Sequence, residues 1–223
     1  MTVIYKKVAL IGLGLIAGSI AHAIRRAGLS DTITGYARSA ETRDISREIK
    51  LCDVVCDSAV DAVKDADLVI LAVPVGAMAA VAKEIGPHLK AGATLSDVGS
   101  VKASVIKNVS PFVPENVHFI PAHPLAGTEH SGPHSGFAEL FDNRWCILVP
   151  TDQTEETALN KLRDFWKALG SNVEIMDAQH HDLVLAVTSH APHLIAYTMV
   201  GVADDLSRVT DKEVINFSAA GFR

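Results

Sequence analysis

Cysteine is scarce in this chain of 223 residues, which contains only Cys52, Cys56 and Cys146. Three cysteines cannot form a complete set of disulfides, and no second cysteine pair joins Cys52 and Cys56 to complete a zinc site. A disulfide-stapled secreted domain is therefore excluded. We expect a cytoplasmic protein whose three thiols behave as small buried hydrophobic groups.

Aromatic residues are also few, at 5%, and no run of basic residues occurs. The 20 Lys and Arg residues face 26 Asp and Glu residues, which gives a formal charge of −6. Because nucleic acids are bound by clustered basic side chains, we expect no nucleic acid partner and a small-molecule substrate instead. A hydrophobic content of 48% with 15 Gly and 9 Pro is ordinary for a globular chain and excludes a disordered or collagen-like one.

An apolar stretch over residues 8–21 follows Lys6 and resembles the core of a signal peptide. It contains Gly12, Gly14 and Gly18, however, and these glycines have the spacing of a turn between a strand and a helix. We therefore interpret the stretch as part of the folded protein.

A second apolar stretch, residues 183–203, has no Asp, Glu, Lys or Arg and is long enough to cross a bilayer. His190 and Pro192 interrupt it, and no basic or aromatic flank anchors it. We therefore expect no membrane partner. A helix that is apolar on all sides is also typical of a protein core or a subunit interface, and we interpret this stretch as such a helix.

Short apolar runs alternate with longer helical patterns along most of the chain. Such alternation predicts an α/β fold with a parallel, doubly wound sheet. We expect strands at 8–11, 33–36, 54–55, 68–73, 94–98 and 117–120, with helices at 15–26 and 40–49. We further expect that 145–150 and 173–176, on either side of a helix at 155–169, complete the same sheet.

The turn after the first expected strand has the pattern G-x-G-x-x-A. Gly12 permits a tight turn, Gly14 allows the backbone to approach a pyrophosphate, and the small Ala17 allows the helix to pack on the strand. The N–H groups at the start of the helix, around Leu15 and Ile16, are free to bind phosphate charge. A strand, this turn and a helix in sequence indicate a dinucleotide-binding site.

The end of the second expected strand bears on the choice of dinucleotide. An acidic residue there binds the ribose of NAD, but this chain has Ala37, Arg38 and Ser39, and Asp31 lies before the strand. Arg38 and Ser39 are able to hold a 2′-phosphate, although a solvated Arg is an equally good interpretation. We therefore favour NADP slightly over NAD and leave both open. The residues expected to contact the cofactor are Gly12, Gly14, Leu15, Ile16, Ala17, Ala37, Arg38, Ser39, Val73 and Pro74.

Two polar residues follow the ends of later strands. Ser100 lies past the strand at 94–98, and His123 lies past the strand at 117–120. Because ligands of doubly wound folds bind at the carboxyl ends of the strands, we expect Ser100 and His123 to meet at one crevice.

A metal site is a weaker interpretation of the histidines. His190 and His193 are three residues apart, but no H-E-x-x-H motif and no carboxylate at matching spacing accompanies them. We expect no metal. We also expect His180 and His181 to be exposed at the start of the last helix.

Four motifs now occur in a fixed order: GLGLIAGS at 12–19, DVGSVK at 97–102, HPLAGTE at 123–129 and TSHAPH at 188–193. Together they resemble the motifs of the prephenate/arogenate (cyclohexadienyl) dehydrogenases of tyrosine biosynthesis, over almost the whole chain. The resemblance implies oxidative decarboxylation of prephenate to 4-hydroxyphenylpyruvate, of arogenate to tyrosine, or of both. Which substrate is used stays open, because the two differ only in a keto or an amino group.

The resemblance also implies roles for particular residues. His123 is implied to be the catalytic histidine, which takes the proton of the ring hydroxyl as hydride leaves the same carbon, and Ser100 to orient that hydroxyl or His123. Thr128, Glu129, Ser189 and His193 are implied to line the substrate pocket.

At the level of architecture the resemblance implies a Rossmann-type domain at 1–176, followed by the beginning of an all-α substrate and dimerisation domain at 177–223. Pro192 is expected to disturb the long helix there. The family continues past Gly221, Phe222 and Arg223 with further helices and an arginine for the substrate carboxylate. We therefore expect a homodimer through the helical domain, and weak or no turnover by residues 1–223 alone.

Two alternatives remain. A β-hydroxyacid dehydrogenase uses a lysine on the long helix, and residues 177–208 contain none. A non-catalytic nucleotide-binding module needs only the glycine turn and leaves Ser100, His123 and His193 unexplained.

Overall fold

A computed structural model describes residues 2–210, so Gly221, Phe222 and Arg223 lie outside the described residues. The chain divides into two compact units, Met1–His181 and Asp182–Arg223.

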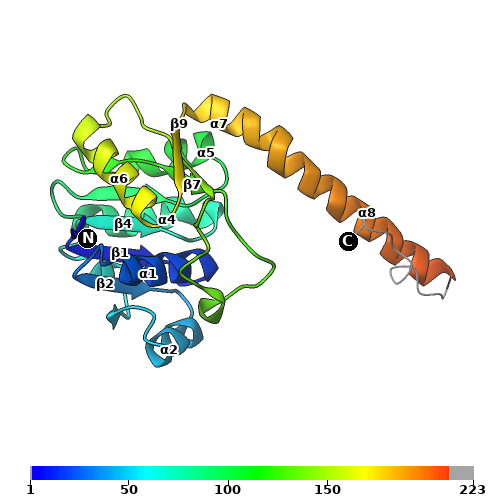
Figure 1. The fold of residues 1–223 in the computed structure, drawn as a ribbon, viewed down its shortest axis with the longest axis horizontal. Coiled ribbons are helices and arrows are strands. Elements are labelled where there is room, and N and C mark those ends of the chain that lie inside the picture. Colours follow the sequence, from blue (N-terminus) through cyan, green and yellow to red (C-terminus); the bar gives the residue numbers. More distant parts are fainter. Residues whose placement is uncertain (1, 211–223) are drawn as a thin grey trace. The chain divides into compact units, whose positions relative to one another are not determined.

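The first unit is built on a six-stranded parallel sheet with the order β3-β2-β1-β4-β5-β6 (Figure 1). The order runs outward in both directions from β1, and this confirms the predicted doubly wound α/β fold. The strands are β1 (Lys7–Ile11), β2 (Thr32–Tyr36), β3 (Val54–Val55), β4 (Leu68–Leu71), β5 (Thr94–Asp97) and β6 (His118–Phe119).

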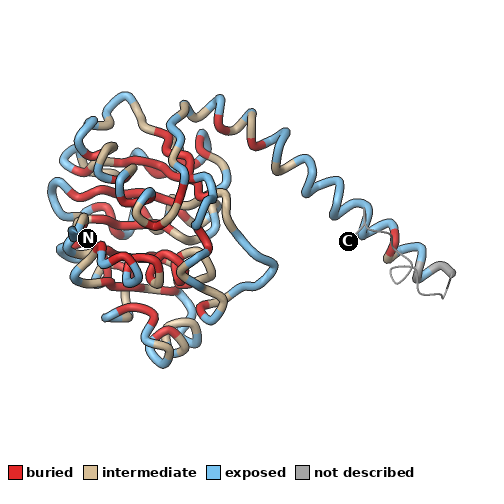
Figure 2. The backbone as a smooth tube through the Cα atoms, in the orientation of Figure 1, coloured by how far each residue is buried: buried red, intermediate tan, exposed pale blue. Residues whose placement is uncertain are grey.

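Helices cover both faces of this sheet, because successive strand residues point to opposite sides. Val8 and Leu10 of β1 pack in the same cluster as residues of α1 and α6, whereas Ala9 and Ile11 pack with residues of α3, α4 and α5. The buried strands and inner helix faces are red in Figure 2. The helices are α1 (Leu15–Ala27), α2 (Ala40–Glu48), α3 (Ala59–Val63), α4 (Val75–Ile85), α5 (Ala103–Val109) and α6 (Glu156–Ala168), with short 3₁₀ turns η1 (Gly86–His88), η2 (Ser110–Phe112) and η3 (Pro133–Ser135).

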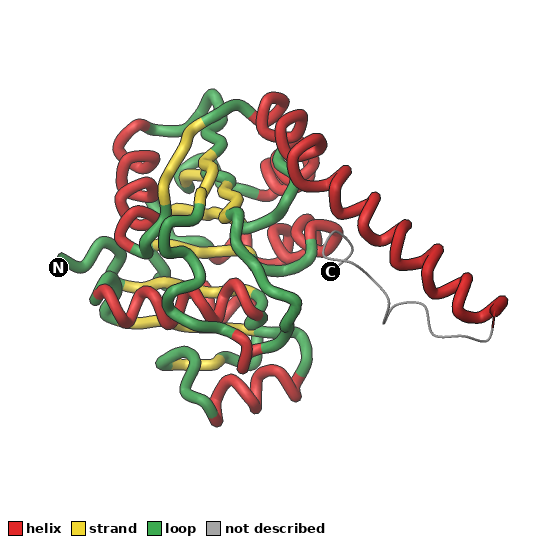
Figure 3. The backbone as a smooth tube through the Cα atoms, turned by 45° about the vertical axis from the view of Figure 1, so that its right-hand side comes forward, coloured by secondary structure: helices red, strands yellow, loops and turns green. Residues whose placement is uncertain are grey.

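The last strands of the first unit form a separate sheet, which corrects the expectation that they complete the first. Here β7 (Ala122–Pro124) pairs antiparallel with β8 (Trp145–Leu148), and β8 pairs parallel with β9 (Asn172–Ile175) (Figure 3). The chain leaves the main sheet directly after the short β6, where Pro121 has no N–H to continue a ladder.

The helix that links the units changes its winding once. It comprises α7 (Ala178–Leu185), a π-helical turn η4 (Ala186–His190) and α8 (Ala191–Thr210). The N–H of Ala191 donates to the carbonyl of Ala186, five residues back, immediately before Pro192. Because proline has no N–H and crowds the preceding turn, the predicted disturbance at Pro192 takes the form of this π turn.

Most large apolar side chains of this helix are exposed. By length and composition, Ala178–Leu206 could cross a membrane, and a core helix of a soluble protein passes the same test. The exposed apolar residues are Leu183, Val187, Leu194, Ile195, Tyr197, Met199, Val200, Val202 and Leu206.

Candidate active site

The loops predicted to bind the cofactor emerge at one edge of the sheet. Ile11 pairs with both Tyr36 and Leu71, and Leu71 pairs with Asp97, so β1, β2, β4 and β5 end in line. The segments that follow these four ends are 12–14, 37–39, 72–74 and 98–102. Ligands of doubly wound sheets bind at this carboxyl edge.

The glycine turn after β1 has a geometry that only glycine tolerates. Gly12 has φ +100°, its N–H donates to the Tyr36 carbonyl at 2.8 Å, and a Cβ added there would lie 2.4 Å from the carbonyl oxygen of Ala72. The same Cβ would lie 3.0 Å from Cγ1 of Val73. Gly12 therefore permits the close approach of β1 to the loop after β4.

The N-terminus of α1 provides an open cradle for phosphate. Gly14 caps the helix, and a Cβ added there would meet no atom within 4 Å. The N–H of Gly18 donates to the Gly14 carbonyl, so the N–H groups of Leu15, Ile16 and Ala17 precede the first intrahelical bond and are directed out of the helix. Because the first turn has no acidic side chain, this end is suited to the pyrophosphate of a dinucleotide.

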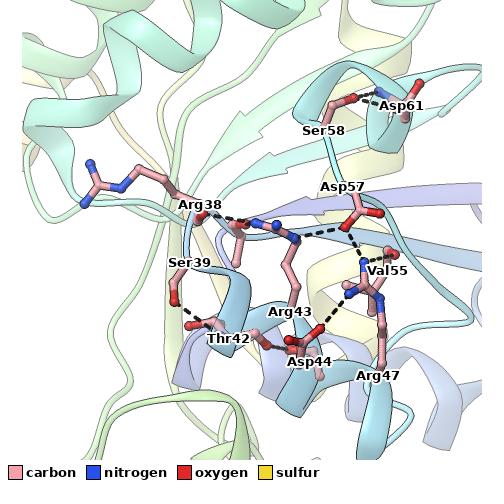
Figure 4. A network of polar contacts seen from close by, with 12 residues as sticks. Arg38, Ser39, Thr42, Arg43, Asp44, Arg47, Val55, Asp57, Ser58 and Asp61 are labelled. Atoms are coloured by element: carbon pink, nitrogen blue, oxygen red, sulfur yellow. Dashed lines mark hydrogen bonds and ion pairs between the residues drawn. The ribbon is translucent and has the colours of Figure 1, made fainter.

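Beyond β2, the side chain of Arg38 is exposed and points away from a network of polar contacts, as Figure 4 shows. Ser39 accepts the Thr42 N–H and caps α2, while the carbonyls of Ala37 and Arg38 both accept from Nη1 of Arg43. Within residues 2–210 the guanidinium of Arg38 makes no such contact. It is therefore available to a ligand at this edge.

The carboxylate of Asp57 in this network is already engaged by two arginines. Oδ1 of Asp57 lies 3.2 Å from Nε of Arg43 and 2.5 Å from Nη2 of Arg47. The hydrogen bond from Arg47 lowers the pKa of Asp57. The guanidinium of Arg43 also lies over the ring of Tyr36, 5.8 Å from its centroid. This end of the site therefore offers cationic groups and no unpaired carboxylate among the residues of Figure 4.

His123 lies on β7 and is 8% exposed. The backbone of Ala122, the preceding residue, is tied to the loop that contains Ser100. Its N–H donates to Oδ1 of Asp97 at 3.3 Å, and its carbonyl accepts from Nζ of Lys102 at 2.6 Å. Ser100 itself is exposed in that loop. The structure thus brings the Ser100 loop and the His123 strand to the same edge of the sheet.

A second histidine, which sequence reasoning missed, contacts His123. Nδ1 of His123 lies 2.9 Å from Nε2 of His181, and the rings meet edge to face at 61°. We expected both His180 and His181 to be exposed; His180 is exposed, but His181 is fully buried. The sequence did contain a signal for this burial. His181 and Leu185 are four residues apart, so they share one face of α7, and both are buried.

The remaining predicted residues are less constrained. Thr128 and Glu129 are exposed on the loop after β7, where Oγ1 of Thr128 accepts the N–H of His130 and Glu129 lies 3.4 Å from the ring of His130. Ser189 lies in the π turn and His193 in α8, both in the second unit, and their part in the site stays a prediction. Pro74, also predicted, is the N-cap of α4.

The fold and the glycine turn define a Rossmann-type, dinucleotide-binding protein. The sequence model described as "Prephenate dehydrogenase, nucleotide-binding domain" matches residues 20–175, and "Prephenate dehydrogenase, dimerization domain" matches residues 177–223. The chain belongs to the prephenate dehydrogenase family.

Individual relatives are similar over nearly the whole chain. Cyclohexadienyl dehydrogenase of Zymomonas mobilis is 43% identical over 220 residues, which cover 99% of this chain and 75% of that protein. Prephenate dehydrogenase of Lactococcus lactis is 35% identical, with 98% of this chain and 59% of that protein covered. Among solved structures, Aquifex aeolicus prephenate dehydrogenase with hydroxyphenyl propionate and NAD+ superposes with a TM-score of 0.87 at 30% identity, covering 97% of this chain and 75% of that one. Synechocystis arogenate dehydrogenase gives a TM-score of 0.79 at 27% identity, covering 97% and 76%.

Proposed function

We propose that this chain catalyses the oxidative decarboxylation of prephenate, arogenate or both, with hydride transfer to a nicotinamide dinucleotide, in tyrosine biosynthesis. The observation that carries this proposal is the placement of a buried histidine, His123, at the sheet edge that also presents the glycine turn. The family to which the chain belongs supports the reaction class.

When bound, the oxidised nicotinamide supplies the hydride acceptor. The imidazole of His123 accepts the proton of the ring hydroxyl through Nε2, because Nδ1 already faces His181. As hydride leaves the hydroxyl carbon, that carbon becomes a ketone. The ring carboxylate then leaves as CO2, its electron pair completes an aromatic ring, and the resulting phenolate oxygen takes the proton back from His123. A neutral imidazole performs this task near neutral pH.

Other residues assist in the proposed reaction. Ser100 orients the substrate hydroxyl or His123, and Thr128, Glu129, Ser189 and His193 line the substrate pocket. Residues 1–176 act as the dinucleotide-binding domain, and residues 177–223 begin a helical domain through which a cytoplasmic homodimer forms. The exposed apolar side chains of α8 support that last assignment.

We propose that Arg38 contributes to the choice of dinucleotide, with NADP slightly favoured over NAD. Its guanidinium has no partner among residues 2–210 and is suited to a 2′-phosphate, and Asp57 is engaged by Arg43 and Arg47. The substitution Arg38→Ala is expected to lower kcat/KM for NADP and to leave kcat/KM for NAD unchanged. An equal effect on both cofactors would contradict this role.

The substitution His123→Asn tests the reaction itself. It is expected to abolish hydride transfer while the dinucleotide still binds, because the glycine turn is untouched. Binding is measured by fluorescence titration of the reduced cofactor. Undiminished turnover by the variant would remove His123 from the mechanism, and dinucleotide binding without turnover in the unsubstituted chain would favour a nucleotide-binding module.

A further inference from the structure

We propose that Gly136 and Ser19 are positioning residues, which attach the loop after β7 to helix α1. This loop, residues 125–136, contains Thr128 and Glu129, and its attachment holds both side chains in place for the substrate. The catalytic meaning of the inference rests on the proposed function, because that proposal places these two side chains in the substrate pocket. The attachment itself is a structural property and can be measured without turnover.

The loop is held at both ends by hydrogen bonds of backbone N–H groups. At its start the N–H of Leu125 donates to the carbonyl of Trp145 in β8 at 2.7 Å. Immediately after its end the N–H of Phe137 donates to Oγ of Ser19 in α1 at 3.1 Å, and Ser19 is fully buried. The loop therefore connects the sheet that contains His123 to the helix whose first turn is suited to a pyrophosphate.

Gly136 makes the attachment possible, because it lies directly against the backbone of α1. A Cβ added to Gly136 would lie 2.7 Å from the carbonyl carbon of Gly18 and 2.8 Å from the backbone nitrogen of Ser19. These atoms belong to a helix and cannot rotate away, so a larger residue must move the loop outward. The backbone of Gly136 is otherwise ordinary, with φ −71° and ψ 141°, and alanine adopts these angles without strain. The close contact alone therefore requires glycine here.

The opposite side of the same contact is less tight. A Cβ added to Gly18 would lie 3.4 Å from Cα of Gly136 and 3.5 Å from the carbonyl oxygen of Pro133, which are ordinary van der Waals distances. Gly18 lies inside α1, where alanine is the better helix former. Gly18→Ala should therefore leave the loop attached, whereas Gly136→Ala should detach it.

Short local hydrogen bonds connect the attached end of the loop to the predicted pocket residues. Oγ of Ser135 donates to the carbonyl of Ser131 at 2.7 Å, and the N–H of His130 donates to Oγ1 of Thr128 at 3.2 Å. Pro133, between these two bonds, is buried. Because the bonds limit how the loop bends, a shift at its attached end is expected to move Thr128 as well. We therefore expect detachment to weaken substrate binding.

Limited proteolysis of residues 1–223 with proteinase K, read by mass spectrometry, tests the attachment. Exposed loops that are not held down are cut first, so we expect cleavage within 125–137 to be on the order of 10-fold faster in Gly136→Ala. Gly18→Ala is the matched control and should be cut at the original rate. Unchanged cleavage in a folded Gly136→Ala, or equally fast cleavage in Gly18→Ala, would overturn the proposal.

Ser19→Ala is a milder second variant, because it removes one hydroxyl and leaves the glycine contact intact. We expect it to accelerate cleavage of the same loop while the midpoint of thermal unfolding changes little. If Gly136→Ala does not fold, Ser19→Ala decides in its place. A loop that is cut no faster in Ser19→Ala would then overturn the proposal.

Kinetics separate positioning from a general loss of structure. In Gly136→Ala and Ser19→Ala, KM for the substrate should rise on the order of 10-fold, while kcat and dinucleotide affinity stay within about twofold. A merely structural role would reduce the fraction of active protein, so a lower kcat at an unchanged KM would contradict positioning. If the unsubstituted chain turns over neither prephenate nor arogenate, the proposed function fails, while proteolysis still decides whether Gly136 and Ser19 hold the loop.

Discussion

Nζ of Lys102 lies 2.6 Å from Oδ2 of Asp97, and both side chains are fully buried. Burial raises the pKa of Asp97, and the Lys102 charge together with the N–H groups of Gly99 and Ala122 opposes that rise. Because Lys102 also donates to the Ala122 carbonyl, the ion pair connects the end of β5 to the strand that holds His123. The pair therefore holds the strand that contains His123 against the end of β5.

The substitution Lys102→Met is expected to destabilise the fold by about 3–5 kcal/mol at pH 8, because it leaves a buried carboxylate without its cation. The loss should be smaller at pH 5. Without Lys102 the folded-state pKa of Asp97 lies further above its unfolded value, so the folded state binds the extra proton and stability falls as pH rises.

Urea unfolding at the two pH values measures this effect. Lys107→Met is the matched control, since Lys107 is exposed on the neighbouring α5, and its effect should stay within about 0.5 kcal/mol. Equal losses for Lys102→Met at both pH values would show that Asp97 does not respond to the missing charge.

The two motif glycines should respond differently to alanine. Gly12→Ala forces a Cβ against the Ala72 carbonyl at a positive φ and is expected to destabilise the fold by about 1–3 kcal/mol. Gly14→Ala places its Cβ in open space, so the melting temperature should change little while dinucleotide affinity falls. Thermal unfolding and cofactor titration separate the effects. Normal affinity in Gly14→Ala would argue against phosphate binding at this helix end.

The three thiols should be poorly reactive in the folded chain. Burial raises the pKa of Cys52 to about 12, and burial also raises the pKa of Cys56 and of Cys146. Little thiolate is therefore present at pH 8. We expect an aromatic disulfide reagent to modify the half-buried Cys56 first and Cys52 and Cys146 only on unfolding, as read by mass spectrometry. Rapid labelling of Cys146 in the folded chain would contradict the described core.

Local patterns were sufficient to predict the first sheet, because its strands β1 to β5 are short and each is followed by a turn and a helix. The second sheet was not predictable in this way. Its pairing of His123 with Ile147 joins residues far apart in the sequence, through a strand too short to show a period. The expectation that all three thiols are buried was likewise wrong for Cys56, which is only partly covered beside α2 and β3.

In the site, too, local patterns predict some features, whereas others depend on contacts between distant parts of the chain. The glycine turn and the segment that begins with His123 are readable as motifs, because each has a recognisable local sequence close to the end of a strand. His180 and His181 are identical in type and adjacent, and only the packing of α7 decides which of them is buried. A contact between two side chains from different elements therefore required the structure.

The proposed reaction is tested by an assay of dinucleotide reduction, followed by near-ultraviolet absorbance. Prephenate and arogenate are offered separately, each with NAD and with NADP, to residues 1–223 and to a form extended past Arg223 with sequence of the Zymomonas relative. We expect reduction that depends on at least one of the two substrates and is abolished in His123→Asn. No reduction with either substrate in either form, while the dinucleotide still binds, would contradict it.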